Sequence, residues 1–217
     1  SHLYKNIEAT LATYFRLDLG IIPELAQFEH ILYTDTDVFF RKDVNYFTQP
    51  VLPDSIMMGF EERDVYPLNA GVFFASMKFL RETHAELIST FANSLNVNDE
   101  KYGPGDQGLL NRMYERQLEA NGPLDNALNT KPYKYFHDDA VIVHFHGPKI
   151  QDYVKYARDG SCRFKDLCVR GFQNGFCNYL RELQLFLDFS ELQTVRKQDI
   201  EIARHKCERS GYFGIWS

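Results

Sequence analysis

The sequence has no excess of basic residues and no long apolar run, and each absence excludes a class of protein. Its 24 Lys and Arg residues against 30 Asp and Glu residues give a net charge of −6, whereas a nucleic-acid-binding surface needs a basic footprint. No apolar run approaches the roughly 18 to 20 residues of a membrane span, and no signal peptide stands at the start. We therefore expect no nucleic-acid partner, and we expect any membrane anchor or targeting segment to lie outside this chain.

Cysteine is scarce and is confined to the later part of the chain, at Cys162, Cys168, Cys177 and Cys207. No two of them form a Cys-x-x-Cys pair, which argues against a zinc site. Four cysteines allow three disulfide pairings, and the sequence does not choose among them. We expect two disulfides, and with them a lumenal compartment of the secretory pathway. Buried reduced thiols and a cytoplasmic location are the alternative.

The chain contains no internal repeat and no low-complexity tract, and helix-like segments alternate with strand-like ones. Apolar residues at helical spacing predict helices over 3–19 and 78–95, and a Gly-rich loop leading into a helix within 103–118. Apolar runs of strand length lie at 30–35, 55–62, 70–77 and 140–145. This alternation indicates an α/β layered domain, and 217 residues suffice for one full core.

The character of the sequence changes after about residue 150. The stretch DGSCRFKDLCVRGFQNGFCNY, residues 159–179, predicts loops, and a final helix is expected near 178–207. We therefore expect a core domain over 1–150 and a cysteine-containing extension over 151–217 that packs on the same domain.

The strand predicted at 30–35 runs into an acidic pair, Asp35 and Asp37, within LYTDTDV. Side chains alternate along an extended segment, so both carboxylates can face one cation, and their mutual repulsion calls for one. Oxygen ligands suit Mg²⁺, Mn²⁺ or Ca²⁺, while a solvated turn capped by Asp35 is the alternative. An EF-hand loop is excluded because no Gly follows at its sixth position. An aspartyl-phosphatase motif is also excluded, because it usually has Thr or Val two residues after its second Asp, where this sequence has Phe39.

Two further stretches place polar residues beside predicted strands. In VIVHFHGPK, His144 and His146 follow a strand, and the Gly and Lys after them could cradle an anion with a backbone amide and an ammonium. One imidazole joined to the acidic pair would favour manganese over calcium. In GPGDQGLLN, Asp106 and Gln107 open a helix, where an N-cap role and the binding of sugar hydroxyls are both open for the carboxylate.

In this order, LYTDTDV, LNAGVFF, GDQGLLN and HFHGPK resemble the motifs of family 8 of the nucleotide-sugar glycosyltransferases, the glycogenin-like and bacterial galactosyltransferase-like group of retaining enzymes. Four ordered motifs between residues 31 and 149 are more specific than any one alone. The resemblance implies a GT-A fold, a Rossmann-like mixed sheet flanked by helices. It also implies a UDP-sugar donor, Mn²⁺ or Mg²⁺, a glycan or glycoprotein acceptor, and the Golgi lumen.

The resemblance also implies roles for single residues. Asp35, Asp37 and His144 match the metal ligands, and Asp106 and Gln107 match the catalytic pair, which binds sugar hydroxyls and positions the anomeric centre. The positions that match donor-binding residues are Arg16, Asp35, Thr36, Asp37, Asn69, Ala70, Gly71, Gly147 and Lys149.

The sequence departs from the family pattern in three places, one of which is the cysteine-containing tail after residue 150, which matches no part of that pattern. Lys149 follows Gly147 by two residues rather than three, and Ile150 comes next where the family has Pro. Only 34 residues precede Asp35, so we expect the strand–helix units that bind uracil and ribose to lie upstream of this sequence.

The mechanism implied by the resemblance uses the metal to neutralise charge on the leaving diphosphate, with attack from the front face. The pair of flanking carboxylates that a retaining glycosidase uses is not evident in the sequence, and Glu61 and Glu62 are alternative acids. Three other functions stay open: an inverting glycosyltransferase on the same fold, a catalytically inactive sugar-nucleotide-binding domain, and a metal-dependent hydrolase of nucleotide sugars.

Overall fold

The computed structural model describes residues 13–44, 52–61, 67–93, 98–99, 101–189 and 197–211. The chain divides into two compact units. Unit 1 takes residues 1–34 and 48–125, and unit 2 takes residues 35–47 and 126–217.

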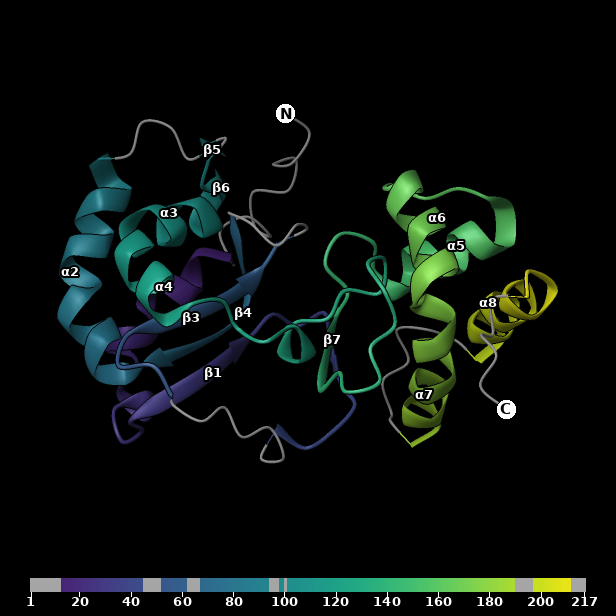
Figure 1. Cartoon of the computed structure of the whole chain (residues 1–217), viewed down its shortest axis with the longest axis horizontal. Coiled ribbons are helices and arrows are strands. Elements are labelled where there is room, and N and C mark those ends of the chain that lie inside the picture. The colour runs from purple at the N-terminus through teal and green to yellow at the C-terminus, as the bar shows by residue number, and fades with distance from the viewer. Residues whose placement is uncertain are drawn as a thin grey trace. The chain divides into compact units, whose positions relative to one another are not determined.

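Unit 1 is built on a three-stranded antiparallel sheet with the strand order β1–β4–β3, beside which the helices α2, α3 and α4 lie (Figure 1). Its elements in chain order are η1 (Phe15–Ile21), η2 (Pro23–Leu25), β1 (His30–Thr34), β3 (Ile56–Phe60), β4 (Leu68–Ser76), α2 (Met77–Asn93), β5 (Asn98–Asp99), β6 (Gly103–Pro104), α3 (Gly105–Met113) and α4 (Glu115–Asn121). The predicted strands and the helix over 78–95 are confirmed. The helix predicted over 3–19 lies largely outside the described residues, and its described end is the 3-10 helix η1.

Strand β4 is the central strand of this sheet, and eight of its nine residues are buried. A short continuous apolar run of this kind is typical of a strand that is covered on both faces. Thr34 of β1 lies opposite Val72, and Met58 of β3 lies opposite Phe73. The antiparallel pairing places the start of β4, with Asn69, at the sheet end where β1 finishes.

Helix α3 begins in the predicted Gly-rich loop, and one of its glycines is required by a close backbone approach. A Cβ on Gly108 would lie 2.2 Å from the carbonyl oxygen of Gly103, a contact that only a backbone shift could relieve. This approach holds the β6 turn against the first turn of α3. The second Gly of GDQG is therefore explained by packing, and the first turn of the helix is fixed in place.

Unit 2 combines a two-stranded antiparallel sheet, β2–β7, with four helices that gather around a second hydrophobic core (Figure 1). Its elements are β2 (Val38–Phe40), η4 (Asn126–Leu128), β7 (Ile142–His144), α5 (Ile150–Asp159), α6 (Lys165–Asn174), α7 (Phe176–Phe189) and α8 (Lys197–Arg209). The predicted boundary at residue 150 falls inside this unit, where residues on both sides of it, such as Val143 and Phe172, share one core.

The prediction of loops over 159–179 is wrong, because α6 and the start of α7 occupy most of this stretch, and α5 was not predicted. Its glycines suggested turns, but Gly171 lies within α6 and serves packing. A Cβ on Gly171 would come within 2.3 Å of Cε1 of Tyr153, a fully buried ring stacked on Phe176 at a centroid distance of 4.1 Å. The single predicted helix near 178–207 is also corrected to two helices, α7 and α8.

Arg41, just after β2, ties the strand to α7 and to the segment that leads into β7. Its guanidinium contacts the carboxylate of Glu182, with Nη2 2.6 Å from Oε1. Its Nη1 donates to the carbonyl oxygens of His137 at 2.9 Å and Ala140 at 3.2 Å. Hydrogen bonds to charged groups are among the stronger ones, so Arg41 fixes the frame on which β2 and β7 pair.

All four cysteines are paired, as Cys162–Cys168 and Cys177–Cys207. The prediction of two disulfides is confirmed, and the structure supplies the pairing that the sequence left open. The second bridge joins α7 to α8, whereas the first closes the short connection between α5 and α6. None of the described helices is long and apolar enough to span a membrane.

The two disulfides should contribute unequally to stability. Cys177–Cys207 closes a loop with a sequence separation of 30, and Cys162–Cys168 one of 6, so chain entropy predicts losses of about 3–4 and about 2 kcal/mol in the free energy of unfolding. We expect urea denaturation to show the larger loss for Cys177→Ala/Cys207→Ala than for Cys162→Ala/Cys168→Ala. Intact mass after thiol blocking of the unfolded wild type should show no labelled cysteine. Equal losses, or labelled wild-type thiols, would contradict this account.

Candidate functional site

The candidate site of unit 2 is organised by the pairing of β2 with β7. Val38 lies opposite His144 in this ladder, and the amide of Phe145 donates a 2.9 Å hydrogen bond to the carbonyl oxygen of Asp37. Asp35 and Asp37 stand directly before β2, and His144 is the last residue of β7. Backbone pairing therefore brings the acidic pair to the imidazole, although the two segments are far apart in the sequence.

Three side chains with metal-ligand atoms converge at this place, Asp35, Asp37 and His144. Their ligand atoms all lie within 4.8 Å of one another. His144 Nε2 is 3.3 Å from Asp37 Oδ1 and 4.0 Å from Asp35 Oδ2. The structure thus brings together the three residues that the sequence predicts as ligands, in a group that a divalent ion could occupy.

His144 is almost fully buried, with 1% of its surface exposed. Burial lowers its pKa from 6.5 to about 4, although the nearby Asp37 carboxylate acts to raise it. The ring is therefore neutral at neutral pH, and neutral imidazole is the form that ligates a metal. On its other side, Nδ1 lies 2.9 Å from Oδ1 of Asn129.

Lys149 contacts the same carboxylate from the other side, with Nζ on Asp37 Oδ2 and 3.2 Å from the carbonyl oxygen of Phe145. Burial alone would raise the pKa of Asp37, but His144 and Lys149 together hold that pKa well below its usual value. Since His144 is neutral at neutral pH, the ammonium of Lys149 is the cation that keeps Asp37 ionised. The lysine predicted to bind a diphosphate therefore lies on a predicted metal ligand in this structure.

The cluster passes a test of fit for a divalent ion. Asp37 Oδ1 and His144 Nε2 are buried and 3.3 Å apart, and neither has any other hydrogen-bond partner among the residues that the structure describes. Buried polar atoms normally have a partner, and leaving them without one costs free energy. An ion bound by carboxylate oxygens and one imidazole nitrogen would satisfy both atoms at once.

The remaining predicted residues of unit 2 surround this cluster. Thr36 is exposed, in the turn between the two aspartates. Gly147 has a φ of +78°, and a Cβ there would lie 3.1 Å from Cδ1 of Leu167, so a side chain is disfavoured. The second histidine, His146, faces elsewhere, with Nδ1 3.2 Å from the hydroxyl of Tyr133. Geometry therefore favours His144 over His146 as the third ligand, a choice that alternation along the strand could not make.

Unit 1 contains a second polar cluster, which begins with a buried ion pair. Arg16 Nε lies 2.7 Å from Asp106 Oδ2, and Arg16 Nη1 donates a 2.5 Å hydrogen bond to the carbonyl oxygen of Ala70. Burial raises the pKa of Asp106 by more than the Arg16 charge lowers it. The predicted N-cap role is not seen, because Asp106 lies inside α3 and Pro104 occupies the cap position.

Amide side chains extend the cluster along the start of β4. Asn69 Nδ2 donates to Glu61 Oε2 at 2.7 Å and to Gln107 Oε1 at 3.3 Å. Gln107 Oε1 also accepts from the amide of Ala70 at 3.1 Å, and Asn69 Oδ1 accepts from the amide of Gly71 at 3.1 Å. All the sequence-predicted residues of unit 1 thus belong to one hydrogen-bonded network.

Asn111 is a residue of this network that the sequence analysis missed. It is fully buried; its Oδ1 accepts from the amide of Leu68 at 2.9 Å, and its Nδ2 donates to the carbonyl oxygens of Leu68 at 2.7 Å and Gln107 at 2.9 Å. These bonds fix the start of β4 against α3. The available signal was an Asn one helical turn after Gln107, on the same helix face.

The alternative acid Glu62 lies outside the described residues.

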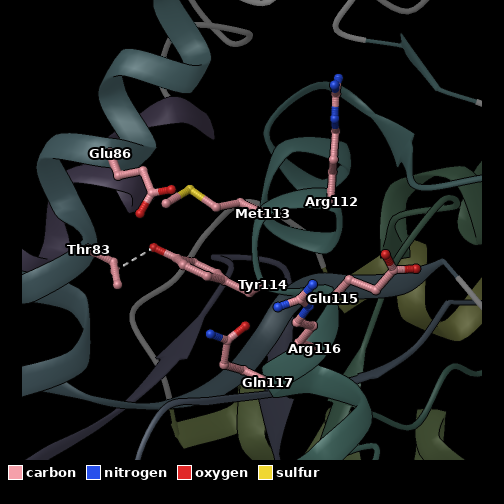
Figure 2. A pocket seen from close by; sticks show the side chains of 8 residues that line it. All are labelled: Thr83, Glu86, Arg112, Met113, Tyr114, Glu115, Arg116 and Gln117. Atoms are coloured by element: carbon pink, nitrogen blue, oxygen red, sulfur yellow. Dashed lines mark hydrogen bonds between the residues drawn. The ribbon is translucent and has the colours of Figure 1, made fainter.

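A separate pocket of about 330 Å³ lies on unit 1, away from this network (Figure 2). Thr83 and Glu86 of α2 line one side, and residues 112–117 of α3 and α4 line the other. The buried hydroxyl of Tyr114 is already paired with Thr83 Oγ1 at 2.8 Å. The hydroxyl groups of Thr83 and Tyr114 therefore bond to each other. We assign no function to this pocket.

No family model and no curated protein matches the chain. Among solved structures, it resembles the glycosyltransferase GlyE of Streptococcus pneumoniae TIGR4, with 16% identity in each of two crystal structures. The apo form gives a TM-score of 0.52 over 80% of this chain and 46% of GlyE, and the other gives 0.53 over 73% and 43%. A structure of the galactosyltransferase LgtC with donor and acceptor sugar analogues matches at 21% identity and a TM-score of 0.49, over 76% of this chain and 68% of LgtC.

At these identities the similarity shows the fold alone, and the LgtC match, below a TM-score of 0.5, carries no weight. The chain spans less than half the length of GlyE. What the comparison establishes is that the chain shares the fold of the glycosyltransferase GlyE, in agreement with the α/β class that the sequence predicted.

Proposed function

We propose that this chain is the catalytic part of a metal-dependent glycosyltransferase of the family 8 type. It would move a sugar from a nucleotide-diphosphate sugar, a UDP-sugar, to a glycan or glycoprotein acceptor, with retention of the anomeric configuration. The observation that carries the proposal is the convergence of Asp35, Asp37 and His144 in a chain that has a glycosyltransferase fold.

The ligand set of unit 2 supports Mn²⁺, or Mg²⁺, as the ion. Asp35 and Asp37 would hold it through carboxylate oxygens and His144 through Nε2. When bound, the ion supplies a Lewis acid that stabilises the negative charge developing on the leaving diphosphate. Lys149 would pair with a phosphate oxygen, and the positive φ of Gly147 would let the backbone approach a ligand closely.

For the polar cluster of unit 1 we propose recognition of a sugar. Sugar hydroxyls both donate and accept, and they suit a carboxylate set among amides. Asp106 would accept from hydroxyl groups while Arg16 holds its carboxylate in one orientation. Gln107 would position the anomeric centre, supported by Asn69 and by the rigid contact of α3 with β4.

The two disulfides support a lumenal, oxidising location such as the Golgi, because structural disulfides rarely persist in the cytosol. This compartment also suits a glycan or glycoprotein acceptor. The donor is best tested by incubating the chain with several UDP- and GDP-sugars, Mn²⁺ and a panel of glycan acceptors, and by measuring product mass. Transfer from one donor with retained configuration would support the proposal. Release of unattached sugar with no acceptor product would instead indicate a hydrolase.

Each aspartate should be needed for the ion, but the two should differ in their effect on stability. We expect Asp35→Asn and Asp37→Asn each to weaken Mn²⁺ binding by more than the roughly 10- to 100-fold that loss of a group behind a ligand costs, and to abolish Mn²⁺-dependent transfer. Without metal, Asp37→Asn should lower the melting temperature by more than Asp35→Asn does, because Asp37→Asn loses the ion pair with Lys149. Titration calorimetry and thermal melts measure both quantities.

His146→Ala is the matched control for these variants, since its ring faces Tyr133 rather than the aspartates. It should keep Mn²⁺ affinity within a few-fold of the wild type. Near-wild-type affinity in either aspartate variant would show that the ion, if bound at all, is held elsewhere.

The Mn²⁺ affinity should depend less on pH than is usual for a site with a histidine ligand. Protons compete with the metal for His144 Nε2, and an imidazole with the ordinary pKa of about 6.5 would lose affinity progressively below that pH. The pKa of His144 is lowered to about 4, so the imidazole stays unprotonated well below pH 6. We expect Mn²⁺ affinity to be nearly constant from pH 7 to pH 5 and to fall only as the pH approaches 4. A tenfold loss of Mn²⁺ affinity for each pH unit below about 6.5 would contradict the assignment of His144 as the third ligand.

A further inference from the structure

His144 has a buried partner on the side of its ring that faces away from the aspartates. Asn129 Oδ1 lies 2.9 Å from His144 Nδ1, and Asn129 and His144 are 3% and 1% exposed. A side-chain hydrogen bond between two buried groups is shielded from competing water, so it constrains both partners strongly. The bond therefore holds the imidazole plane in one orientation.

The backbone fixes Asn129 in register with His144. The amide of Thr130 donates to the carbonyl oxygen of Ile142 at 3.0 Å, and the amide of His144 donates to the carbonyl oxygen of Thr130 at 2.7 Å. Thr130 and Val143 thus form a parallel β-bridge, and Asn129 precedes it by one residue. The amide of Asn129 also bonds to the carbonyl oxygen of Asn126 at 3.2 Å, which anchors the segment at the end of η4.

The same contact selects the tautomer of the ring. An amide oxygen can only accept, so Nδ1 must carry the proton that it donates to Asn129 Oδ1. A neutral imidazole has one N–H, which leaves Nε2 with a lone pair. Nε2 points to the side where Asp37 Oδ1 lies at 3.3 Å, and neither atom has another hydrogen-bond partner among the described residues. A lone pair facing a carboxylate suits a shared cation and does not suit a direct hydrogen bond.

We propose that Asn129 is a positioning residue for the metal site: it holds His144 as the Nδ1–H tautomer with the Nε2 lone pair aimed at the point shared with Asp35 and Asp37. The inference rests on the proposed metal-dependent function. Hydrogen-bonded groups behind a ligating histidine set its tautomer, orientation and basicity, and their loss typically costs about 10- to 100-fold in metal affinity. Neither LYTDTDV nor HFHGPK contains Asn129, so no motif in the sequence pointed to it.

The binding experiment uses Mn²⁺ alone, without nucleotide, on the full chain. Asn129→Leu keeps the size of the side chain and removes the acceptor, and we expect it to weaken Mn²⁺ binding by about 10- to 100-fold. Asn129→Asp keeps an acceptor at the same place and should bind Mn²⁺ at least as tightly as the wild type. Thr130→Val is the matched control, because it removes a neighbouring buried hydrogen bond, from Oγ1 to the carbonyl oxygen of Asn126 at 2.7 Å, without touching His144.

The outcomes separate this inference from the proposed function. If the wild type does not bind Mn²⁺, both the proposed metal-dependent function and the role of Asn129 are overturned. If the wild type binds and Asn129→Leu binds equally well, the metal site stands and the role of Asn129 is overturned. Equal weakening by Asn129→Leu and Thr130→Val would also overturn it, since the effect would then come from local packing.

A spectroscopic measurement on the metal-free wild type covers the case in which Asn129→Leu fails to fold. Long-range ¹H–¹⁵N correlation spectra of the histidine rings distinguish a protonated Nδ1 from a protonated Nε2. We expect His144 to be the Nδ1–H tautomer at neutral pH, with Nε2 changing signal first when Mn²⁺ or a diamagnetic substitute such as Mg²⁺ is added. An Nε2–H tautomer, donating to Asp37 instead, would overturn the inference whatever the variants do.

Discussion

The site of unit 2 depends on electrostatic repulsion between acceptor atoms. The carboxylates of Asp35 and Asp37 and the neutral imidazole of His144 present these atoms to one point within a partly buried site. Such a cluster is unstable on its own and becomes stable when a cation joins its members. In this structure the ammonium of Lys149 pairs with Asp37. The imidazole nitrogen 3.3 Å from that carboxylate has no other partner among the described residues. The pairing of β2 with β7, the clamp of Arg41 and the bond from Asn129 all serve to keep these atoms together against their repulsion.

The polar cluster of unit 1 is built on the opposite principle. Arg16 pairs with Asp106, and Asn111 binds both backbone groups of Leu68. A network of this kind is rigid and nearly neutral, which suits hydroxyl ligands that exchange one hydrogen bond for another rather than ions. The two clusters therefore differ in chemistry in the way that the two halves of a nucleotide-sugar differ, a charged diphosphate and a neutral sugar.

Sequence reasoning recovered what local pattern encodes and missed what depends on tertiary contact. The strands of unit 1 and the helix over 77–93 follow from apolar periodicity, and the ligand triad follows from motif order. Helix α6 was missed because Gly171 suggests a turn when only the chain is considered, whereas in the fold it makes room for the ring of Tyr153. Asn129 and Asn111 were missed because their importance lies in partners distant in the sequence, and alternation could not choose between His144 and His146 for the same reason.

The central claim is that Asp35, Asp37 and His144 bind one divalent ion. The most direct test is anomalous diffraction at the manganese edge from crystals grown with Mn²⁺ and UDP. The account predicts a single strong peak at roughly 2.0–2.6 Å from both carboxylates and from His144 Nε2, with Lys149 withdrawn from Asp37 toward a phosphate oxygen. An ordered site with no anomalous peak there and Lys149 still on Asp37, or a peak held by other residues, would contradict it.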